Sequence, residues 1–144
     1  MKKELALSGK VVSGIKQGAF FVSLDWFQKQ CLEKLGFKPY PGTLNLELSL
    51  ENMAIIDELE QENGVEFIPS NATFCTGRAF PVLLEGVRGA IIIPAEEVRV
   101  HGKNTVEVIA PLRLKEVLDL KDGDFIRLSF ESALLEGMKY SNDS

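Results

Sequence analysis

The chain has 144 residues, of which 45% are hydrophobic and 26% charged, and its net charge is −5. This length allows one buried core but not two good ones, and the composition is that of an ordinary globular domain. The acidic balance argues against non-specific nucleic-acid binding, which needs a basic face. It does not exclude a phosphate ligand, which a few lysines or backbone amides can hold.

The cysteine and histidine content argues against a Cys/His metal cage. Cys31 and Cys75 stand far apart, and His101 is the only histidine, so buried free thiols are expected. Polar residues interrupt the apolar stretch that a signal peptide would need near the N-terminus, and no run approaches the roughly 18 apolar residues of a membrane helix. We therefore expect a soluble, cytoplasmic protein that binds neither membrane nor nucleic acid.

The first part of the chain predicts two short strands and a helix. Residues 5–12 and 20–24 are expected as strands, and the glycine-containing loop 13–18 lies between them. A helix is expected to begin at Asp25 as N-cap and to end at Gly36. Its apolar residues recur at helical spacing: Phe27, Cys31, Leu32 and Leu35.

A rigid turn at residues 39–42 precedes a segment of strict alternation at residues 43–48. In a strand this alternation sends three leucines to one face, namely Leu44, Leu46 and Leu48. The other face then carries Thr43, Asn45 and Glu47. Residues 50–62 fit either a helix or an acidic excursion.

The second half of the chain is dominated by segments typical of strands. These are residues 65–68, 73–84, 87–93, 105–109 and 125–130. Pro111 is expected to be the first residue of a short helix, and residues 121–124 are expected to form a turn. About six strands with two short helices favour a mostly β, compact barrel over a βαβ sheet. We expect one barrel domain at residues 1–135, followed by a polar tail at 136–144.

Two segments could contact phosphate and metal. The amides of residues 13–19, helped by Lys16, could cradle an anion, although the loop is not a Walker A loop and an ordinary strand connection is the alternative. Thr43 and Asn45 offer two neutral oxygens on one strand face, which could hold a Mg²⁺ completed by phosphate and water. A solvated strand face is the alternative there.

A carboxylate inside an apolar run is a third candidate. Val106 and Val108 are expected to face the core, so Glu107 faces the other side, where it could accept a proton or hydrogen bond from a sugar hydroxyl. The alternative is an exposed strand glutamate. Arg88, in an expected turn at residues 86–90, could meet a phosphate or simply lie on the surface.

Four stretches together carry a family resemblance. They are "GKVVSGIKQGAFFVSL", "LGFKPYPGTLNLEL", "GAIIIP" and "VEVIAPLRLKEVLDLKDGDFIRL", in this order between residues 9 and 128. The chain resembles the CTP-dependent riboflavin kinases, described mainly from archaea. The resemblance implies a six-stranded cradle-loop, riboflavin kinase-like barrel. It also implies Mg²⁺-assisted transfer of a phosphate from CTP to riboflavin, giving FMN and CDP.

The resemblance also implies roles for individual residues. The loop that cradles the nucleotide maps to Gly14, Ile15, Lys16, Gln17, Gly18, Ala19 and Phe20. A second nucleotide-binding segment maps to Leu112, Arg113, Leu114 and Lys115. The Mg²⁺ ligands map to Thr43 and Asn45. The glutamate that contacts the ribityl chain, and serves as the expected catalytic residue, maps to Glu107.

Two positions depart from the family pattern. Lys16 stands where the family commonly has the middle glycine of its loop, and Val100 stands at the flavin-binding position where the family tends to carry threonine. These departures keep open a flavin- or nucleotide-binding barrel without catalysis. A barrel DNA-binding regulator is a further alternative because of the "LKDGDFIRL" segment, and the acidic charge weighs against it.

Overall fold

The computed structural model describes residues 6–13, 22–60, 64–69, 77–94 and 104–130. Its elements are β1 (Ala6–Val12), α2 (Asp25–Leu35), β2 (Leu44–Leu48), α3 (Leu50–Glu60), β3 (Val65–Phe67), β4 (Gly77–Leu84), β5 (Val87–Pro94), β6 (Thr105–Ile109), α4 (Leu114–Val117) and β7 (Phe125–Phe130). The described strands form one sheet in the order β3-β4-β5-β6-β2-β1-β7.

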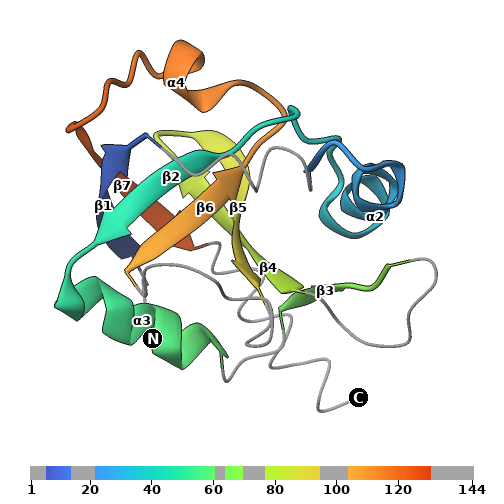
Figure 1. Ribbon diagram of the computed structural model, residues 1–144, viewed down its shortest axis with the longest axis horizontal. Helices are drawn as coiled ribbons and strands as arrows, with labels where there is room; N and C mark the ends of the chain where they lie inside the picture. The colour runs from blue at the N-terminus through green and yellow to red at the C-terminus, as the bar shows by residue number, and fades with distance from the viewer. Residues whose placement is uncertain (1–5, 14–21, 61–63, 70–76, 95–103, 131–144) are drawn as a thin grey trace.

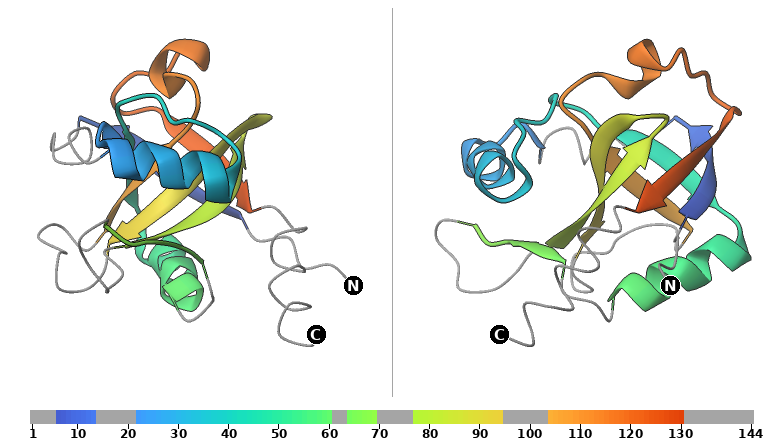
Figure 2. Two further views of the ribbon diagram at one scale, coloured as in Figure 1. Left: turned by 90° about the vertical axis from the view of Figure 1, so that its right-hand side faces the viewer. Right: turned by 180° about the vertical axis from the view of Figure 1, so that it is seen from behind.

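An additional antiparallel pairing of β4 with β7 closes this sheet. Six strands therefore form a ring, and β3 extends it outside the ring from β4 (Figures 1 and 2). Closure pairs the ladder hydrogen bonds of the ring strands and so removes open edges. The predicted six-stranded β-barrel with short helices is confirmed.

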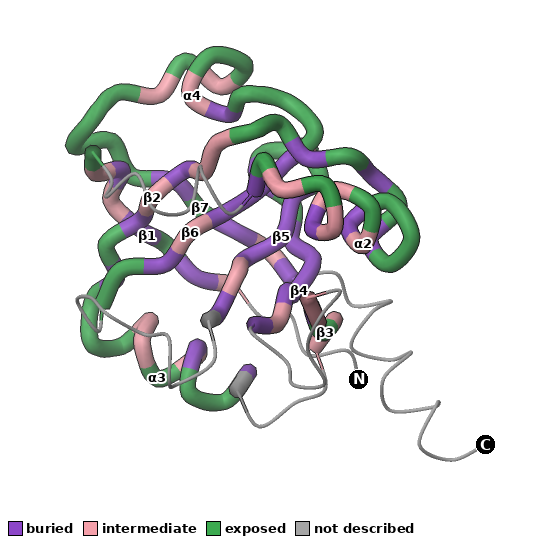
Figure 3. The backbone as a smooth tube through the Cα atoms, turned by 45° about the vertical axis from the view of Figure 1, so that its right-hand side comes forward, coloured by how far each residue is buried: buried purple, intermediate pink, exposed green. Residues whose placement is uncertain are grey.

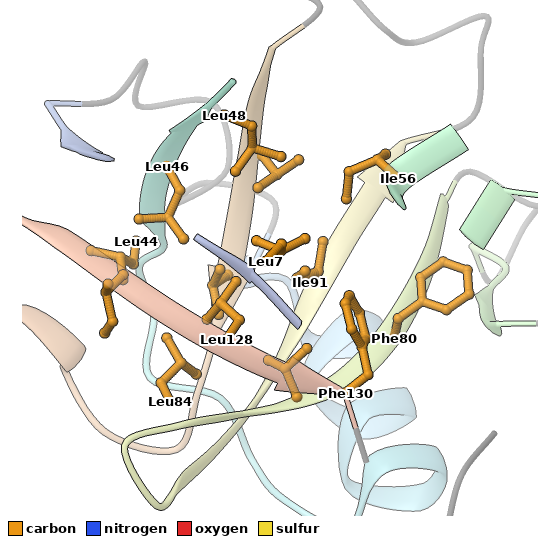
Figure 4. Packing of buried hydrophobic residues seen from close by; sticks show 14 of the residues in the cluster. Leu7, Leu44, Leu46, Leu48, Ile56, Phe80, Leu84, Ile91, Leu128 and Phe130 are labelled. Atoms are coloured by element: carbon orange, nitrogen blue, oxygen red, sulfur yellow. The ribbon is translucent and has the colours of Figure 1, made fainter. Parts of the chain in front are cut away.

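The barrel interior is filled by the side chains of alternate strand positions (Figure 4). Leu44, Leu46 and Leu48 of β2 are at most 3% exposed and point inward, as the alternation predicts. Leu114 of α4 covers one end of this core, and residues of α3 cover the other, so the two helices lie at opposite ends of the barrel in Figure 1. Burial of each such leucine contributes about 1.5–3 kcal/mol.

A second core lies outside the barrel, under α2. The apolar face of α2 (Phe27, Cys31 and Leu35) packs with Ala90 and Ile109 on the outer faces of β5 and β6. Part of the sheet is therefore buried on both faces, as the purple strands beside α2 show in Figure 3. Cys31 is the buried free thiol expected from sequence, and burial raises its pKa to about 12. Cys75 and the tail 136–144 lie outside the described residues.

The expected strand at residues 20–24 is wrong for its described part. Val22 is buried against the α2 core, and the chain turns toward the helix at residues 22–24. The amide of Gln28 donates to the carbonyl of Leu24, which is the N-cap in place of Asp25. Asp25 is instead in the first turn. Its negative charge there is attracted by the positive end of the helix dipole and stabilises the helix. Gly36 ends the helix with φ 82°, as predicted.

The short helix after β6 begins later than expected. The carbonyl of Ala110 accepts a hydrogen bond from the amide of Tyr40 at 2.7 Å, and this ties the chain at Pro111 to the preceding turn. Helix α4 therefore starts at Leu114, with Arg113 as its N-cap. The ambiguous segment at residues 50–62 contains helix α3.

The turn between β4 and β5 is shorter than the expected turn at residues 86–90. It contains Glu85 and Gly86, whose φ angles of 48° and 86° suit a two-residue hairpin of the type I′ kind. Val87 already belongs to β5. From this strand, Nη2 of Arg88 donates to the carbonyl of Leu35 at 3.1 Å, at the C-terminal end of α2.

Gly89 is a position where the barrel tolerates no side chain. A Cβ there would lie 2.7 Å from the carbonyl oxygen of Ile109 and 3.1 Å from a methyl of Leu84. Because a sheet carbonyl cannot move aside cheaply, we expect Gly89→Ala to lower the free energy of unfolding by about 3 kcal/mol in chemical denaturation. The control is Gly86→Ala, which meets no atom within 4 Å and should lose only about 1 kcal/mol through its positive φ. An equal loss in both variants would contradict this packing argument.

Candidate functional site

A row of side chains crosses the outer face of the barrel on neighbouring strands. Asn45 of β2 lies between Val12 of β1 and Glu107 of β6, and Glu107 in turn pairs with Ile92 of β5. Thr43 shares this face with Asn45 because the two residues are two positions apart. Directly opposed residues have Cβ atoms about 5 Å apart, so strand pairing brings Thr43, Asn45 and Glu107 together.

Thr43 and Glu107 are in direct contact. The Thr43 hydroxyl donates to Oε1 of Glu107 at 2.8 Å, across 64 positions of sequence. Burial raises the pKa of Glu107 above its usual value, and the hydrogen bond from Thr43 opposes this shift. On the side of Ile92 the carboxylate borders the apolar core under α2. It is thus a half-buried carboxylate with a raised proton affinity, which suits a group that takes up a proton.

Two of these residues, Thr43 and Asn45, fit a hard cation. Because the Thr43 hydroxyl directs its hydrogen at Glu107 in a hydrogen bond, its oxygen lone pairs remain available. The amide oxygen of Asn45 lies on the same face of β2. Neutral oxygens of this kind suit Mg²⁺ when phosphate oxygens and water complete the shell. Among the described residues no three His, Cys, Asp or Glu side chains form a metal-binding group.

A second polar cluster lies where β1 ends and β7 begins. This is the end of the barrel at which Asn45 pairs with Val12. Asp122 accepts hydrogen bonds from the hydroxyl of Ser13 and, at 3.0 Å, from the ammonium of Lys115. These two donors, Ser13 foremost, lower the pKa of Asp122. Backbone hydrogen bonds of 2.7 Å from Val11 to Asp124 and from Gly123 to Val11 hold the turn against β1. The cluster therefore places Lys115 beside the residue that begins the glycine-rich loop.

The structure describes only some of the ligand-binding positions expected from sequence. The nucleotide loop at residues 14–20 and the flavin-binding position Val100 lie outside the described residues. Leu112 and Arg113 are exposed, and Lys115 is in the cluster around Asp122. Leu114 is only 4% exposed and packs in the barrel core, so its side chain is structural, and its carbonyl accepts a hydrogen bond from the amide of Leu118 at 2.9 Å.

One polar residue of this region has no counterpart in the sequence interpretation. Nε2 of Gln28 donates to the carbonyls of Val22 and Pro39, at 2.7 and 3.0 Å. A signal was present in its spacing: Gln28 stands three positions before Cys31, on the buried side of α2. The amphipathic pattern of the helix does not by itself distinguish such a glutamine from an ordinary surface residue.

A comparison with protein-family models decides the family. The model named CTP-dependent riboflavin kinase, which carries the description "Domain of unknown function DUF120", matches residues 11–130. The chain belongs to the CTP-dependent riboflavin kinase family. The match includes Thr43, Asn45, Glu107 and the cluster around Asp122, so both polar groups lie within the family domain.

Curated relatives of this family are archaeal proteins named riboflavin kinase. The protein of Archaeoglobus fulgidus is 41% identical over 128 residues, which are 86% of this chain and 54% of the relative. That of Pyrobaculum islandicum is 41% identical over 128 residues, covering 86% and 59%. That of Methanosarcina acetivorans is 34% identical over 139 residues, covering 94% and 57%. The chain thus spans between half and two thirds of the length of these riboflavin kinases.

No helix in the described part of the chain combines the length and the apolar character needed to cross a bilayer.

Proposed function

We propose that this chain transfers the terminal phosphate of CTP to the 5′-hydroxyl of riboflavin and releases FMN and CDP. The observation that carries the proposal is the hydrogen bond between Thr43 and Glu107. It joins a residue assigned to the metal with the residue assigned to the ribityl chain. A site built for this transfer needs both within reach of one phosphate. Membership of the CTP-dependent riboflavin kinase family and the names of the archaeal relatives support the same activity.

The proposed reaction is a direct displacement at phosphorus. The 5′-hydroxyl oxygen of riboflavin forms a bond to the γ-phosphorus of CTP, and the bond from that phosphorus to the β–γ bridging oxygen breaks. CDP leaves with the electron pair, and the hydroxyl proton passes to Glu107. The raised pKa of this half-buried carboxyl suits it to receive the proton.

The other residues position and neutralise charge in this proposal. Thr43 and Asn45 would hold Mg²⁺, which when bound neutralises phosphate charge and aligns the reacting groups. Amides of residues 14–20, with Lys16, would hold the CTP phosphates, and Lys115 stands beside the start of that loop. Val100 would contact the flavin without offering a hydrogen bond. One barrel domain at residues 1–135 and a cytoplasmic location remain predictions from composition.

The choice of donor is the direct test of this function. Purified protein is incubated with riboflavin, Mg²⁺ and either CTP or ATP, and FMN is measured by fluorescence after chromatography. We expect FMN with CTP and at least about 10-fold less with ATP, a discrimination worth about 1.4 kcal/mol. Equal rates with both nucleotides would remove the CTP assignment. Binding of both ligands without FMN formation would favour the binding module without catalysis that the positions of Lys16 and Val100 keep open.

A further inference from the structure

We propose that Gln28 is a positioning residue, which holds the segment that leads into the strand carrying Thr43 and Asn45. The inference rests on the proposed function and adds a residue from helix α2, outside the barrel, to that site. Its basis is one side-chain amide that holds two separate segments of chain.

The geometry of this amide is unambiguous. Nε2 of Gln28 carries two hydrogens, and each has a carbonyl acceptor: Val22 at 2.7 Å and Pro39 at 3.0 Å. The opposite orientation of the amide would direct its oxygen at two carbonyl oxygens and repel both. The side chain therefore acts as a bridge that joins residue 22 to residue 39 through two donated bonds.

Of the two bridged segments, the one at Pro39 leads directly to the proposed site. Pro39 comes four residues before Thr43, and the next residue, Tyr40, is bonded through its amide to Ala110, just beyond β6. The ring of Tyr40 also lies against Gly42, within 3.3 Å of where a Cβ of Gly42 would stand. A displacement of Pro39 would thus be passed on to the start of β2.

The amide is kept at a cost to stability. Within the described part of the chain, Oε1 of Gln28 is buried and has no hydrogen-bond partner. A buried acceptor without a partner destabilises a fold, and an apolar side chain of the same shape would avoid that penalty. A residue that destabilises the fold locally is expected at positions that serve function. We therefore assign Gln28 to alignment of the segment that leads to Thr43 rather than to the stability of α2.

The same helix offers a matched control. Gln30 is also part-buried, and its amide also bonds to backbone: Nε2 to the carbonyl of Ile68 at 2.6 Å, and Oε1 from the amide of Ile68 at 3.0 Å. These bonds tie α2 to the chain after β3, not to the segments that flank the proposed site. Gln28→Met removes two hydrogen bonds, and Gln30→Met removes three, because the ammonium of Lys34 also donates to Oε1 of Gln30 at 3.3 Å. Both variants keep side-chain length, so they separate positioning from general anchoring of the helix.

The test measures kcat and KM for CTP and riboflavin in both variants. For Gln28→Met we expect kcat to fall by about 10- to 100-fold, the scale of a small misalignment of reacting groups. KM values should stay within about 3-fold, because the groups that bind each substrate are themselves unchanged. For Gln30→Met we expect kcat within about 2-fold of wild type, even if its melting temperature falls further. An unchanged kcat in Gln28→Met, or equal losses in both variants, would overturn the inference.

A variant with an ionisable side chain at position 28 should make activity depend on pH in a way that a general loss of helix packing would not. In Gln28→Glu an ionised carboxylate repels both carbonyls, but a protonated carboxyl can donate to one of them. The activity of Gln28→Glu relative to wild type should therefore rise as pH falls, whereas that of Gln28→Met should stay flat. Parallel profiles for the two variants would contradict the bridging role.

Hydrogen exchange separates this inference from the proposed function. In Gln28→Met the amides of Tyr40 and Gly42 should exchange faster than in wild type, and those of the β4–β5 hairpin should not change. Absence of FMN formation by wild type would refute the proposed function, whereas unchanged exchange at Tyr40 and Gly42 would refute the bridge itself.

Discussion

Replacement of Asn45 by alanine is expected to reduce FMN formation by about 100-fold while the melting temperature stays within a few degrees of wild type. Asn45 is on the outer face of β2, away from the barrel core, so its loss opens no cavity. The expected defect lies in the metal: with one neutral oxygen fewer, Mg²⁺ holds the phosphates less well. The Mg²⁺ concentration for half-maximal activity should rise accordingly, with partial rescue at high Mg²⁺.

The control for this variant stands two residues further along the strand. Glu47 shares the outer face with Asn45, but it is exposed and lies 3.8 Å from Lys10 in an ion pair that contributes little to stability. Glu47→Ala should keep its activity and its Mg²⁺ dependence. Full activity of Asn45→Ala at low Mg²⁺ would show that the metal is held elsewhere, and Thr43 would then lose its assignment as well.

Replacement of Glu107 by glutamine is expected to lower kcat by about 10²- to 10⁴-fold, the range of a lost general base. Glutamine keeps the size of the side chain and can still accept the hydrogen bond from Thr43, but it cannot take up the proton of the riboflavin hydroxyl. KM for CTP should change little. A kcat within 10-fold of wild type would mean that Glu107 only orients the ribityl chain.

The pH dependence of activity follows from the same carboxyl. Burial raises the pKa of Glu107 above its ordinary 4.5, and the bond from Thr43 lowers it again. In wild type kcat should fall as the carboxyl is protonated on the acid side. In Thr43→Val the opposing hydrogen bond is gone, so this acid limb should move to higher pH. A limb that moves to lower pH, or disappears, would contradict the assignment of the base.

Stability should respond to pH in the opposite sense to activity. A raised folded-state pKa means that Glu107 favours the fold in its protonated form. That contribution is fully present below 4.5, the ordinary pKa of the group, and is lost as pH rises through its folded-state value. Glu107→Gln should therefore melt at a higher temperature than wild type at neutral pH, and the difference should vanish in acid. Thermal melts at pH 4 and pH 8 measure it.

The sequence by itself determined the barrel and the side of the strand on which each site residue lies. The leucines of β2 alternate with Thr43 and Asn45 because side chains of a strand point to opposite faces. The valines of β6 place Glu107 on the outer face by the same rule, and both placements are confirmed. Short-range chemistry also sufficed for the glycine that ends α2. The family resemblance supplied roles for these positions, which their spacing could not.

Secondary-structure predictions from local sequence were wrong where tertiary contacts outweighed local propensity. Val22 has high strand propensity, but its burial under α2 and the bond from Gln28 to its carbonyl turn the chain into the helix instead. Pro111 is a common first residue of helices, yet the bond from Tyr40 to Ala110 holds this part of the chain outside α4. Propensity is a weak preference, and a few buried contacts are enough to override it.

Only the tertiary structure decided which polar residues meet. Thr43 and Glu107 are 64 positions apart, and their contact depends on the register of β2 against β6. Ser13, Lys115 and Asp122 meet because antiparallel pairing brings the end of β1 and the start of β7 to one end of the barrel. A shift of one residue in the ladder between β2 and β6 would send Glu107 to the other face of the sheet relative to Thr43 and Asn45. Register is set by the packing of the whole core, and no single segment of the sequence contains it.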